Sequence, residues 1–290
     1  MHDDEVTVDE ALVRRLLAAQ HPEYAALPLS RVAESGTDNA LFRLGDDLAV
    51  RLPRIPSAHR QVAKEQQWLA RLAPHLPLPV PVPVAHGVPG EGYPYVWSVC
   101  RWLPGGTVAE GPESAAADLA AFLLALRAVD ATGGPAPGDH NFGRGVTLAE
   151  RDETYRRRAA ELDGVLDPRV LLEAWDEALA APAWDGPPVW IHGDLHGANL
   201  AVSDGRVSGV LDWGGLGVGD PACDVMVAWT YLPRAARAAF RDAVGADDAT
   251  WARARGWVLS MGVNALPYYL PRSPRIAAQS RRWIDLALAD

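Results

Sequence analysis

The sequence predicts an α+β fold with two lobes: a small N-terminal lobe of antiparallel strands with one helix, and a larger, mainly helical C-terminal lobe. Short β-branched and aromatic runs dominate the chain up to Leu103, and amphipathic helical patterns dominate the rest. The length of 290 residues suits two units. Apolar residues make up 49% of the chain and charged residues 22%, which is typical of a globular protein and excludes a disordered one.

The N-terminal half carries the pattern of a small sheet. Residues 9–19 have the apolar spacing of an amphipathic helix, and strand-like runs follow at residues 30–35, 40–44 and 48–52. The glycine and two aspartates at 45–47 are typical of a hairpin turn. The last two runs should therefore pair as antiparallel strands.

A second helix is expected over residues 57–72, with Ser57 as its cap. Val62, Glu65, Leu69 and Leu72 share one face of this helix through their spacing of three and four residues. A glutamate on an apolar face needs a partner inside the fold, because burying an unpaired carboxylate is energetically expensive.

The lobe boundary follows a proline-rich connector and one more strand. Five of the ten residues at 74–83 are prolines, which excludes a helix there and favours an extended chain. Residues 95–103 form an apolar, aromatic run that stops at the Pro-Gly-Gly sequence of 104–106. We place the boundary at this break.

Helical patterns cover most of the second half, at residues 113–129, 148–162, 168–179, 221–231, 234–244, 248–265 and 273–289. Between residues 189 and 219 the pattern changes to short β-runs at 189–191, 200–202 and 207–211, with a hairpin signal at 204–205. Polar, glycine-rich loops separate these runs. Such an insert in a helical lobe is a typical place for functional residues.

Charge and cysteine content narrow the class of protein. The net charge is −10, with −2 up to Leu103 and −8 beyond it, which argues against nucleic acid as the main partner. Cys100 and Cys223 are far apart and indicate a reducing compartment. The acidic N-terminus does not look like a secretion signal, and no apolar run is long enough to span a membrane. We therefore expect a cytoplasmic protein without a membrane partner, and leave its oligomeric state open.

The densest group of polar residues lies at 192–199, which reads HGDLHGAN. Asp194 and Asn199 are five positions apart, the spacing of the kinase catalytic loop H-R-D-x-x-x-x-N. Asp212, Trp213 and Gly214 follow where kinases have D-F-G. These residue types suit phosphoryl transfer: Asn199 and Asp212 supply oxygen ligands for Mg²⁺, and Asp194 is placed to orient a hydroxyl and accept its proton. His192 is expected to hold the backbone of the loop.

These segments, with the sequence GDPACD at 219–224, resemble the signature of the aminoglycoside phosphotransferase family, which includes macrolide kinases. The likeness extends from about residue 32 to the last helices. It implies a bilobal, protein-kinase-like fold, with residues 1–103 as the nucleotide-binding lobe, a hinge at about 100–104, and residues 104–290 as the catalytic and acceptor-binding lobe. It also implies Asp194 as the catalytic base, Asn199 and Asp212 as magnesium ligands, and Asp224 as a structural carboxylate.

The resemblance places the nucleotide site in the first lobe. Ser35, Gly36, Thr37 and Asn39 lie where the family has a phosphate-covering loop, although only one glycine is present. Arg51 takes the place of the usual strand lysine and can pair with Glu65. The segment containing Arg101 and Leu103 aligns with the hinge, whose backbone groups would bind adenine. The implied cofactors are ATP, with GTP as an alternative, and Mg²⁺.

Several functions compete for this pattern. The acceptor hydroxyl is expected on an aminoglycoside- or macrolide-like antibiotic, because the acidic second lobe suits a cation and its aromatic helices suit a macrolide. A metabolic sugar or amino alcohol is the alternative acceptor, and a nucleotide-binding regulator without turnover is the alternative to an enzyme. The sequence GDLHG at 193–197 also resembles a binuclear metal phosphoesterase motif, but no histidine follows His196 to complete such a site.

Overall fold

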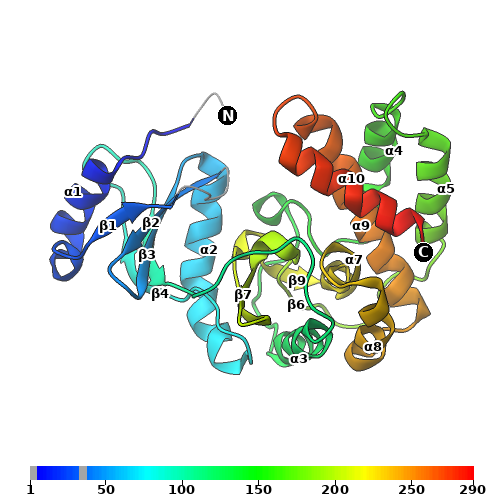
Figure 1. Ribbon diagram of the computed structural model, residues 1–290, viewed down its shortest axis with the longest axis horizontal. Coiled ribbons are helices and arrows are strands. Elements are labelled where there is room, and N and C mark those ends of the chain that lie inside the picture. The colour runs from blue at the N-terminus through cyan, green and yellow to red at the C-terminus, as the bar shows by residue number, and fades with distance from the viewer. Residues whose placement is uncertain (1–4, 33–37) are drawn as a thin grey trace.

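The structure, a computed structural model, describes residues 5–32 and 38–290. Its N-terminal part is a five-stranded antiparallel sheet in the order β1-β2-β3-β5-β4. The strands are β1 (Leu29–Arg31), β2 (Asn39–Leu44), β3 (Leu48–Pro53), β4 (Pro83–Gly87) and β5 (Trp97–Arg101). Helices α1 (Glu10–Gln20) and α2 (Pro56–Leu72) flank this sheet (Figure 1). The expected α+β fold with a small antiparallel sheet in its N-terminal lobe is confirmed.

The predicted hairpin joins β2 and β3, and its turn begins at Gly45, whose φ of 56° lies in the left-handed region that favours glycine. Ala40, Phe42 and Leu44 alternate as buried residues along β2. They share a core with the apolar face of α1, which Asp9 caps through a 2.7 Å hydrogen bond from the backbone of Leu12. The expected strand at 30–35 is described only as far as Arg31, and residues 33–35 lie outside the described part of the chain.

Helix α2 lies between the sheet and the C-terminal part (Figure 1). The predicted face is buried along its whole length, Glu65 included. Ser57 does not cap it, contrary to expectation: the helix begins at Pro56, with Ile55 in the cap position. Proline is favoured at the first helical position, since its fixed φ suits the helix and it has no N–H to satisfy.

The proline-rich connector differs from expectation at both ends. A 3₁₀ turn (Ala73–His75) opens it, and its last proline begins β4, a strand the sequence did not predict. Strand β4 is at the edge of the sheet and pairs only with β5. An edge strand tolerates proline because its outward side needs no N–H donor.

The C-terminal part is mainly helical, as expected. Its helices are α3 (Ala115–Ala128), α4 (Asp152–Ala160), α5 (Pro168–Leu179), α6 (Ala222–Val225), α7 (Val227–Thr230), α8 (Arg234–Val244), α9 (Asp248–Tyr269) and α10 (Pro274–Leu288). The helix expected at 148–162 opens with a 3₁₀ turn (Leu148–Arg151), and the one at 221–231 is split into α6 and α7. Helix α9 continues four residues past its expected end and contains Pro267.

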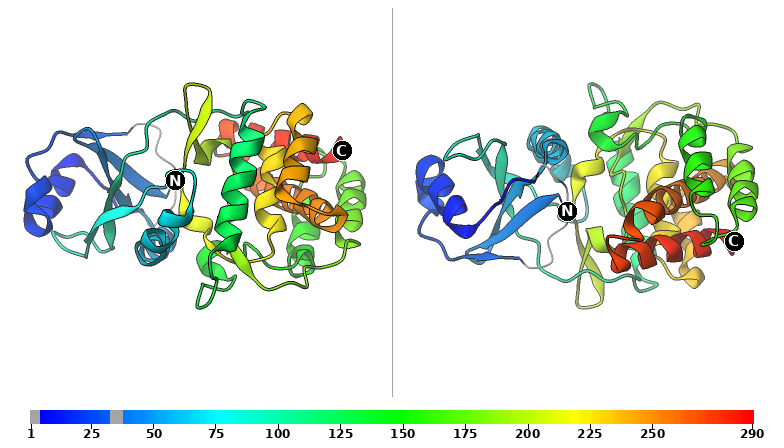
Figure 2. Two further views of the ribbon diagram at one scale, coloured as in Figure 1. Left: turned by 90° about the horizontal axis from the view of Figure 1, so that it is seen from below. Right: turned by 90° about the horizontal axis from the view of Figure 1, so that it is seen from above.

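Two small antiparallel pairs lie within this helical part. Strand β6 (Val189–Ile191) pairs with β9 (Gly217–Gly219), which was not predicted, and β7 (Leu200–Ser203) pairs with β8 (Arg206–Val210). The β7–β8 hairpin lies between α2 and the C-terminal helices, an order along the long axis that Figure 2 shows from two sides. One apolar core joins α2 to the helices and these strands. Among the described residues, no helix combines the length and apolar character needed to cross a bilayer.

Candidate active site

The segment predicted to carry the chemistry is the loop between β6 and β7. Asn199 is buried there, and its Nδ2 donates to the backbone oxygen of Asp194 at 2.9 Å and to its carboxylate Oδ2 at 3.0 Å. The side-chain amide oxygen of Asn199 accepts no hydrogen bond from any described residue. The five-residue spacing therefore brings the two side chains into direct contact.

His192 and Asp224 hold this loop in place. The backbone N–H groups of His192 and Gly193 donate to the two carboxylate oxygens of Asp224, at 2.7 and 2.8 Å. The His192 ring bridges Leu211 O at 2.9 Å and the backbone N of Asp194 at 3.2 Å, and burial lowers its pKa. The expected backbone-holding role of His192 is confirmed by these contacts.

Gly193 is required by the packing of two loops. Its φ of +83° lies in the left-handed region, and a Cβ there would lie 2.3 Å from the carbonyl oxygen of Gly215. The close approach at Gly193 is to the loop that follows Asp212, so this glycine fixes the two loops against each other.

Asp212 and Asn199 lie at the same end of the β7–β8 hairpin. Asn199 precedes β7 and Leu211 follows β8, and the backbone N of Leu211 donates to Asn199 O at 2.8 Å. Asp212 has a φ of 51°, which is unusual for a residue with a side chain and directs it out of the strand. Trp213 behind it is fully buried and donates to Val210 O at 3.1 Å.

Asp194 is held in its charged form. Burial opposes ionisation, but His196, Arg144 and His192 outweigh it and keep the pKa of Asp194 well below its usual range. His196 Nε2 lies 3.4 Å from Oδ2 of the carboxylate, and Arg144 Nη2 lies 3.6 Å from Oδ1. The group is therefore a carboxylate at neutral pH and can accept a hydrogen bond from a hydroxyl.

The N-terminal lobe contributes Arg51, which the sequence placed opposite Glu65. Arg51 Nη1 lies 2.5 Å from Glu65 Oε2 on α2, and Nη2 lies 3.1 Å from Asp212 Oδ1. Burial works against the charge of Arg51, but the two carboxylates outweigh it and raise its pKa. Burial raises the pKa of Glu65, and Arg51 opposes that shift. This side chain connects β3, α2 and the Asp212 loop.

The other residues expected at the nucleotide site are only partly placed. Ser35, Gly36 and Thr37 lie outside the described residues. Asn39 begins β2 two residues after Thr37, and its side-chain oxygen is buried without a hydrogen-bond partner in the described part of the chain. Arg101 ends β5 with an exposed side chain. The backbone N–H of Trp102 donates a hydrogen bond to Asp47 O. The backbone N–H of Leu103 makes no hydrogen bond to another described residue.

The metal ligands predicted from the sequence suit magnesium chemically. Within residues 5–32 and 38–290, no cluster of three or more His, Cys, Asp or Glu side chains forms a metal site. A site made from the amide oxygen of Asn199 and the carboxylate of Asp212 would supply two hard oxygen ligands. Magnesium is commonly held by one or two such protein groups, with water and substrate phosphates completing its shell.

The profile of the phosphotransferase enzyme family, APH, matches residues 30–257 of this chain. The chain belongs to the phosphotransferase enzyme family. It is a phosphotransferase, as the sequence predicted.

Solved structures of similar proteins confirm the protein-kinase-like fold. The GDP complex of wild-type aminoglycoside 2'-phosphotransferase-IIIa has a TM-score of 0.75 and 17% identity, over 97% of this chain and 99% of that chain. The apoenzyme of macrolide 2'-phosphotransferase MphH from Brachybacterium faecium has a TM-score of 0.62 and 27% identity, over 97% of both chains. The protein YcbJ of Bacillus subtilis strain 168 is 26% identical over 232 residues, which are 70% of each chain.

Two residues of the phosphotransferase site were not found from the sequence. Arg144 comes from the loop before α4 and pairs with Asp194. Lys64 of α2, the single lysine of the chain, donates to Gly214 O at 2.9 Å and to His140 O at 3.2 Å. Burial lowers the pKa of Lys64 to about 8. Lys64 thus connects α2 to the loop after Asp212. Lys64 and Gly214 are 150 positions apart, and no local sequence pattern predicts a contact over that separation.

The support from Asp224 gives a stability prediction. Asp224→Ala removes the acceptor of two buried N–H groups, each of which costs about 1–3 kcal/mol when left unsatisfied. We expect the free energy of unfolding to fall by about 2–5 kcal/mol in urea denaturation. Asp242→Ala, on the exposed face of α8, is the control and should change it by less than about 0.5 kcal/mol. Equal stability of the two variants would show that Asp224 does not hold the loop.

Proposed function

We propose that this phosphotransferase transfers the γ-phosphoryl group of ATP, with Mg²⁺, to a hydroxyl group of a small molecule. The observation that carries the proposal is the contact of Asn199 Nδ2 with both the backbone and the carboxylate of Asp194. This contact joins the proposed base and a proposed metal ligand in one rigid unit. GTP is the alternative donor, since one of the similar solved structures is a GDP complex.

Asp194 is the proposed catalytic base. It accepts a hydrogen bond from the acceptor hydroxyl and directs that oxygen at the γ-phosphorus. The new oxygen–phosphorus bond forms, the bond from phosphorus to the bridging oxygen of ADP breaks, and the hydroxyl proton passes to the carboxylate. Because the pKa of Asp194 is low, the carboxylate orients the hydroxyl first and takes the proton late, when the forming bond has made that proton acidic.

The proposed metal ligands are Asn199, through its amide oxygen, and Asp212. When bound, Mg²⁺ neutralises the charge of the β- and γ-phosphates. The hairpin that joins the two residues keeps them at a fixed distance from the base. Since Asn199 also contacts Asp194, displacement of the metal site would displace the base.

Residues 1–103 are the proposed nucleotide-binding lobe, with a hinge at about 100–104, and residues 104–290 the proposed catalytic and acceptor-binding lobe. Arg51 would bind the phosphates, with Glu65 fixing its direction. Ser35, Gly36, Thr37 and Asn39 would cover the phosphates. Arg101 and Leu103 would receive the adenine on their backbone groups, of which the N–H of Leu103 has no partner among the described residues.

The acceptor is proposed by class. Aminoglycosides and macrolides are the first to test, because similar solved structures are of kinases named for these antibiotics. Metabolic sugars and amino alcohols are the second group. We also propose a cytoplasmic location, in keeping with the two cysteines, Cys100 and Cys223, which are buried and free.

The proposal is tested by mixing the protein with Mg²⁺ and ATP or GTP and following release of the nucleoside diphosphate with each candidate acceptor. Turnover that depends on an acceptor and disappears in Asp194→Ala supports a kinase. Nucleotide binding without turnover on any acceptor would favour a regulator. Loss of antibiotic action in a host that expresses the protein extends the search to compounds that no panel contains.

Arg51 gives a kinetic prediction for the nucleotide site. Arg51→Ala is expected to raise KM for ATP about tenfold, because a charge-assisted contact to phosphate is lost, while KM for the acceptor changes little. Arg60→Ala, an exposed arginine of α2, is the control and should leave both constants near the wild-type values. A larger rise in KM for the acceptor than for ATP would remove Arg51 from the nucleotide site.

A further inference from the structure

A pocket of about 590 Å³ lies against the loop that carries Arg144, the arginine nearest to the Asp194 carboxylate. Its walls are the loop at 142–146, the 3₁₀ turn before α4, one side of α4 and one side of α9. Arg144 lines the pocket, and its Nη2 lies 3.6 Å from Oδ1 of Asp194, so a molecule bound to this guanidinium is one side chain away from the proposed base. The charged groups on its walls are Arg144, Glu150, Arg151 and Arg158.

Arg144 is poorly satisfied by the protein. Its side chain is only 14% exposed, yet its guanidinium makes no hydrogen bond to any described residue, and Nε is buried without a partner. The nearest carboxylate oxygen, Oδ1 of Asp194, is 3.6 Å away, beyond hydrogen-bond distance. A guanidinium has five N–H donors, and leaving them unmade in a buried position is costly.

Arg151 adds a second positive charge. Its Nε donates to Ser260 Oγ at 2.6 Å and its Nη1 to the backbone oxygen of Phe142 at 3.2 Å, and it lies 4.8 Å from the ring centre of Trp257. Among the described residues it has no carboxylate partner, and its Nη2 has no hydrogen-bond partner. Burial and the charge of Arg144 lower the pKa of Arg151 to about 10.

The other two charges of the pocket are already used. Arg158 pairs with Glu161 at 2.7 Å. Glu150 accepts hydrogen bonds from the backbone N and the hydroxyl of Thr147, at 3.1 and 3.0 Å, as part of a helix cap. Of the two arginines, only Arg144 lies near a carboxylate, that of Asp194, which the proposed reaction needs for the acceptor hydroxyl.

We infer that this pocket receives the acceptor by an anionic group, a carboxylate or a phosphate, which binds between Arg144 and Arg151 while the acceptor hydroxyl faces Asp194. An oxyanion supplies the lone pairs that the unused N–H groups lack and balances the two charges. The inference rests on the proposed function and narrows its acceptor class. A cationic acceptor would meet two uncompensated positive charges at this place, in spite of the acidic excess of the lobe as a whole.

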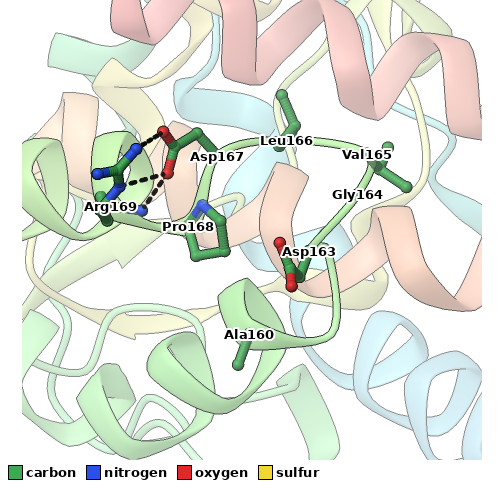
Figure 3. A pocket seen from close by; sticks show the side chains of 8 residues that line it. All are labelled: Ala160, Asp163, Gly164, Val165, Leu166, Asp167, Pro168 and Arg169. Carbon is green, nitrogen blue, oxygen red and sulfur yellow. Dashed lines mark hydrogen bonds and ion pairs between the residues drawn. The ribbon is translucent and has the colours of Figure 1, made fainter.

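A second hollow in the surface shows the contrast. It is formed by residues at the end of α4, at the start of α5 and in the loop between them. Its arginine, Arg169, and its aspartate, Asp167, pair with each other (Figure 3). Arg169 donates to the Asp167 carboxylate through Nη2 at 2.9 Å, and its backbone N donates to the same group. The arginine of that hollow is therefore paired with a carboxylate. In the pocket lined by Arg144, both arginines keep N–H groups without a hydrogen-bond partner among the described residues.

The test is equilibrium binding to the wild-type protein, with the nucleotide site filled by Mg²⁺ and a non-hydrolysable ATP analogue. The probes are inorganic phosphate and three six-carbon polyols that differ at one end: gluconate, sorbitol and glucamine. Isothermal titration calorimetry reports occupancy. We expect gluconate or phosphate to bind at least about tenfold more tightly than sorbitol, and glucamine most weakly. Stronger phosphate binding indicates a phosphorylated acceptor, and stronger gluconate binding an acid.

Variants locate the site. Arg151→Gln and Arg144→Gln should each weaken binding of the anionic probe about tenfold or more. Arg157→Gln removes the same charge from the exposed side of α4 and should leave it within about twofold. Equal affinity for all three polyols, preference for glucamine, no saturable anion binding, or anion binding that survives both variants overturns the inference.

Failure of the inference is distinguishable from failure of the proposed function. Binding of the Mg²⁺–ATP analogue and slow release of ADP to water need no acceptor, and they test the nucleotide site and Asp194 alone. If both are present and anions do not bind, only the acceptor class is wrong. If neither is present, the proposed function fails whatever the pocket binds.

Discussion

Asp194→Asn is expected to lower kcat by about 10²- to 10⁴-fold while leaving affinity for the nucleotide near the wild-type value. The amide keeps the shape of the side chain and one oxygen for the hydrogen bond from Asn199 Nδ2. It cannot take a proton from the acceptor hydroxyl. Steady-state release of ADP measures the first effect, and equilibrium binding of the nucleotide measures the second.

The matched control for this variant is Asp204→Asn. Asp204 lies in the turn of the β7–β8 hairpin with a φ of 52°, a conformation that asparagine adopts readily. The same chemical change ten residues away should leave kcat within about twofold. If Asp194→Asn retains full turnover, the carboxylate is not the base, and the low pKa of Asp194 reflects structural pairing with Arg144 and His196 alone.

Asp212→Asn is expected to reduce Mg²⁺-dependent turnover on the order of 10³-fold, since a neutral amide holds the cation and the phosphate charge far less well. The loss should be partly recovered at high Mg²⁺ concentration. The side chain of Asp212 is 50% exposed, and among the described residues its hydrogen bonds and ion pairs are limited to Arg51 and the backbone of Gly214. The free energy of unfolding should therefore change by less than about 1 kcal/mol.

Two measurements on Asp212→Asn decide the assignment. The Mg²⁺ concentration that gives half-maximal turnover should be higher than in the wild-type protein. The Tm should be the same as that of Asp204→Asn. Wild-type turnover at all Mg²⁺ concentrations would exclude Asp212 as a ligand. A large loss of stability would instead assign the residue a role in holding the lobes together.

Local patterns predicted most elements well where one face of the element decides its structure. Helices α5 and α8 and strand β6 begin and end at the predicted residues. Strands β4 and β9 were not predicted, each for a different reason. The proline that opens β4 argues against a strand unless it lies at an edge, and only the assembled sheet shows that it does. Strand β9 has three residues, two of them glycines, and exists because β6 pairs with it.

The residues of the candidate site also include some that the sequence predicts and some that only the structure shows. Asp194, Asn199 and Asp212 belong to one stretch of chain whose spacing carries information, and the structure joins them through one loop and one hairpin. Arg144 lies 50 residues before Asp194 in a loop without periodicity, and Lys64 looks like one more charge on a helix. Their contacts arise from the packing of distant segments, so only the folded chain shows them.

The two-sided contact of Arg51 has a consequence for the order of assembly. With Glu65 on one side and Asp212 on the other, the guanidinium already neutralises much of the carboxylate that the cation would use. A free divalent ion would therefore find only a weak site at Asn199 and Asp212, and the phosphates of a bound nucleotide would supply the further oxygen ligands that it needs. We therefore expect Mg²⁺ and the nucleotide to bind together as one complex, and the protein without nucleotide to bind Mg²⁺ only weakly.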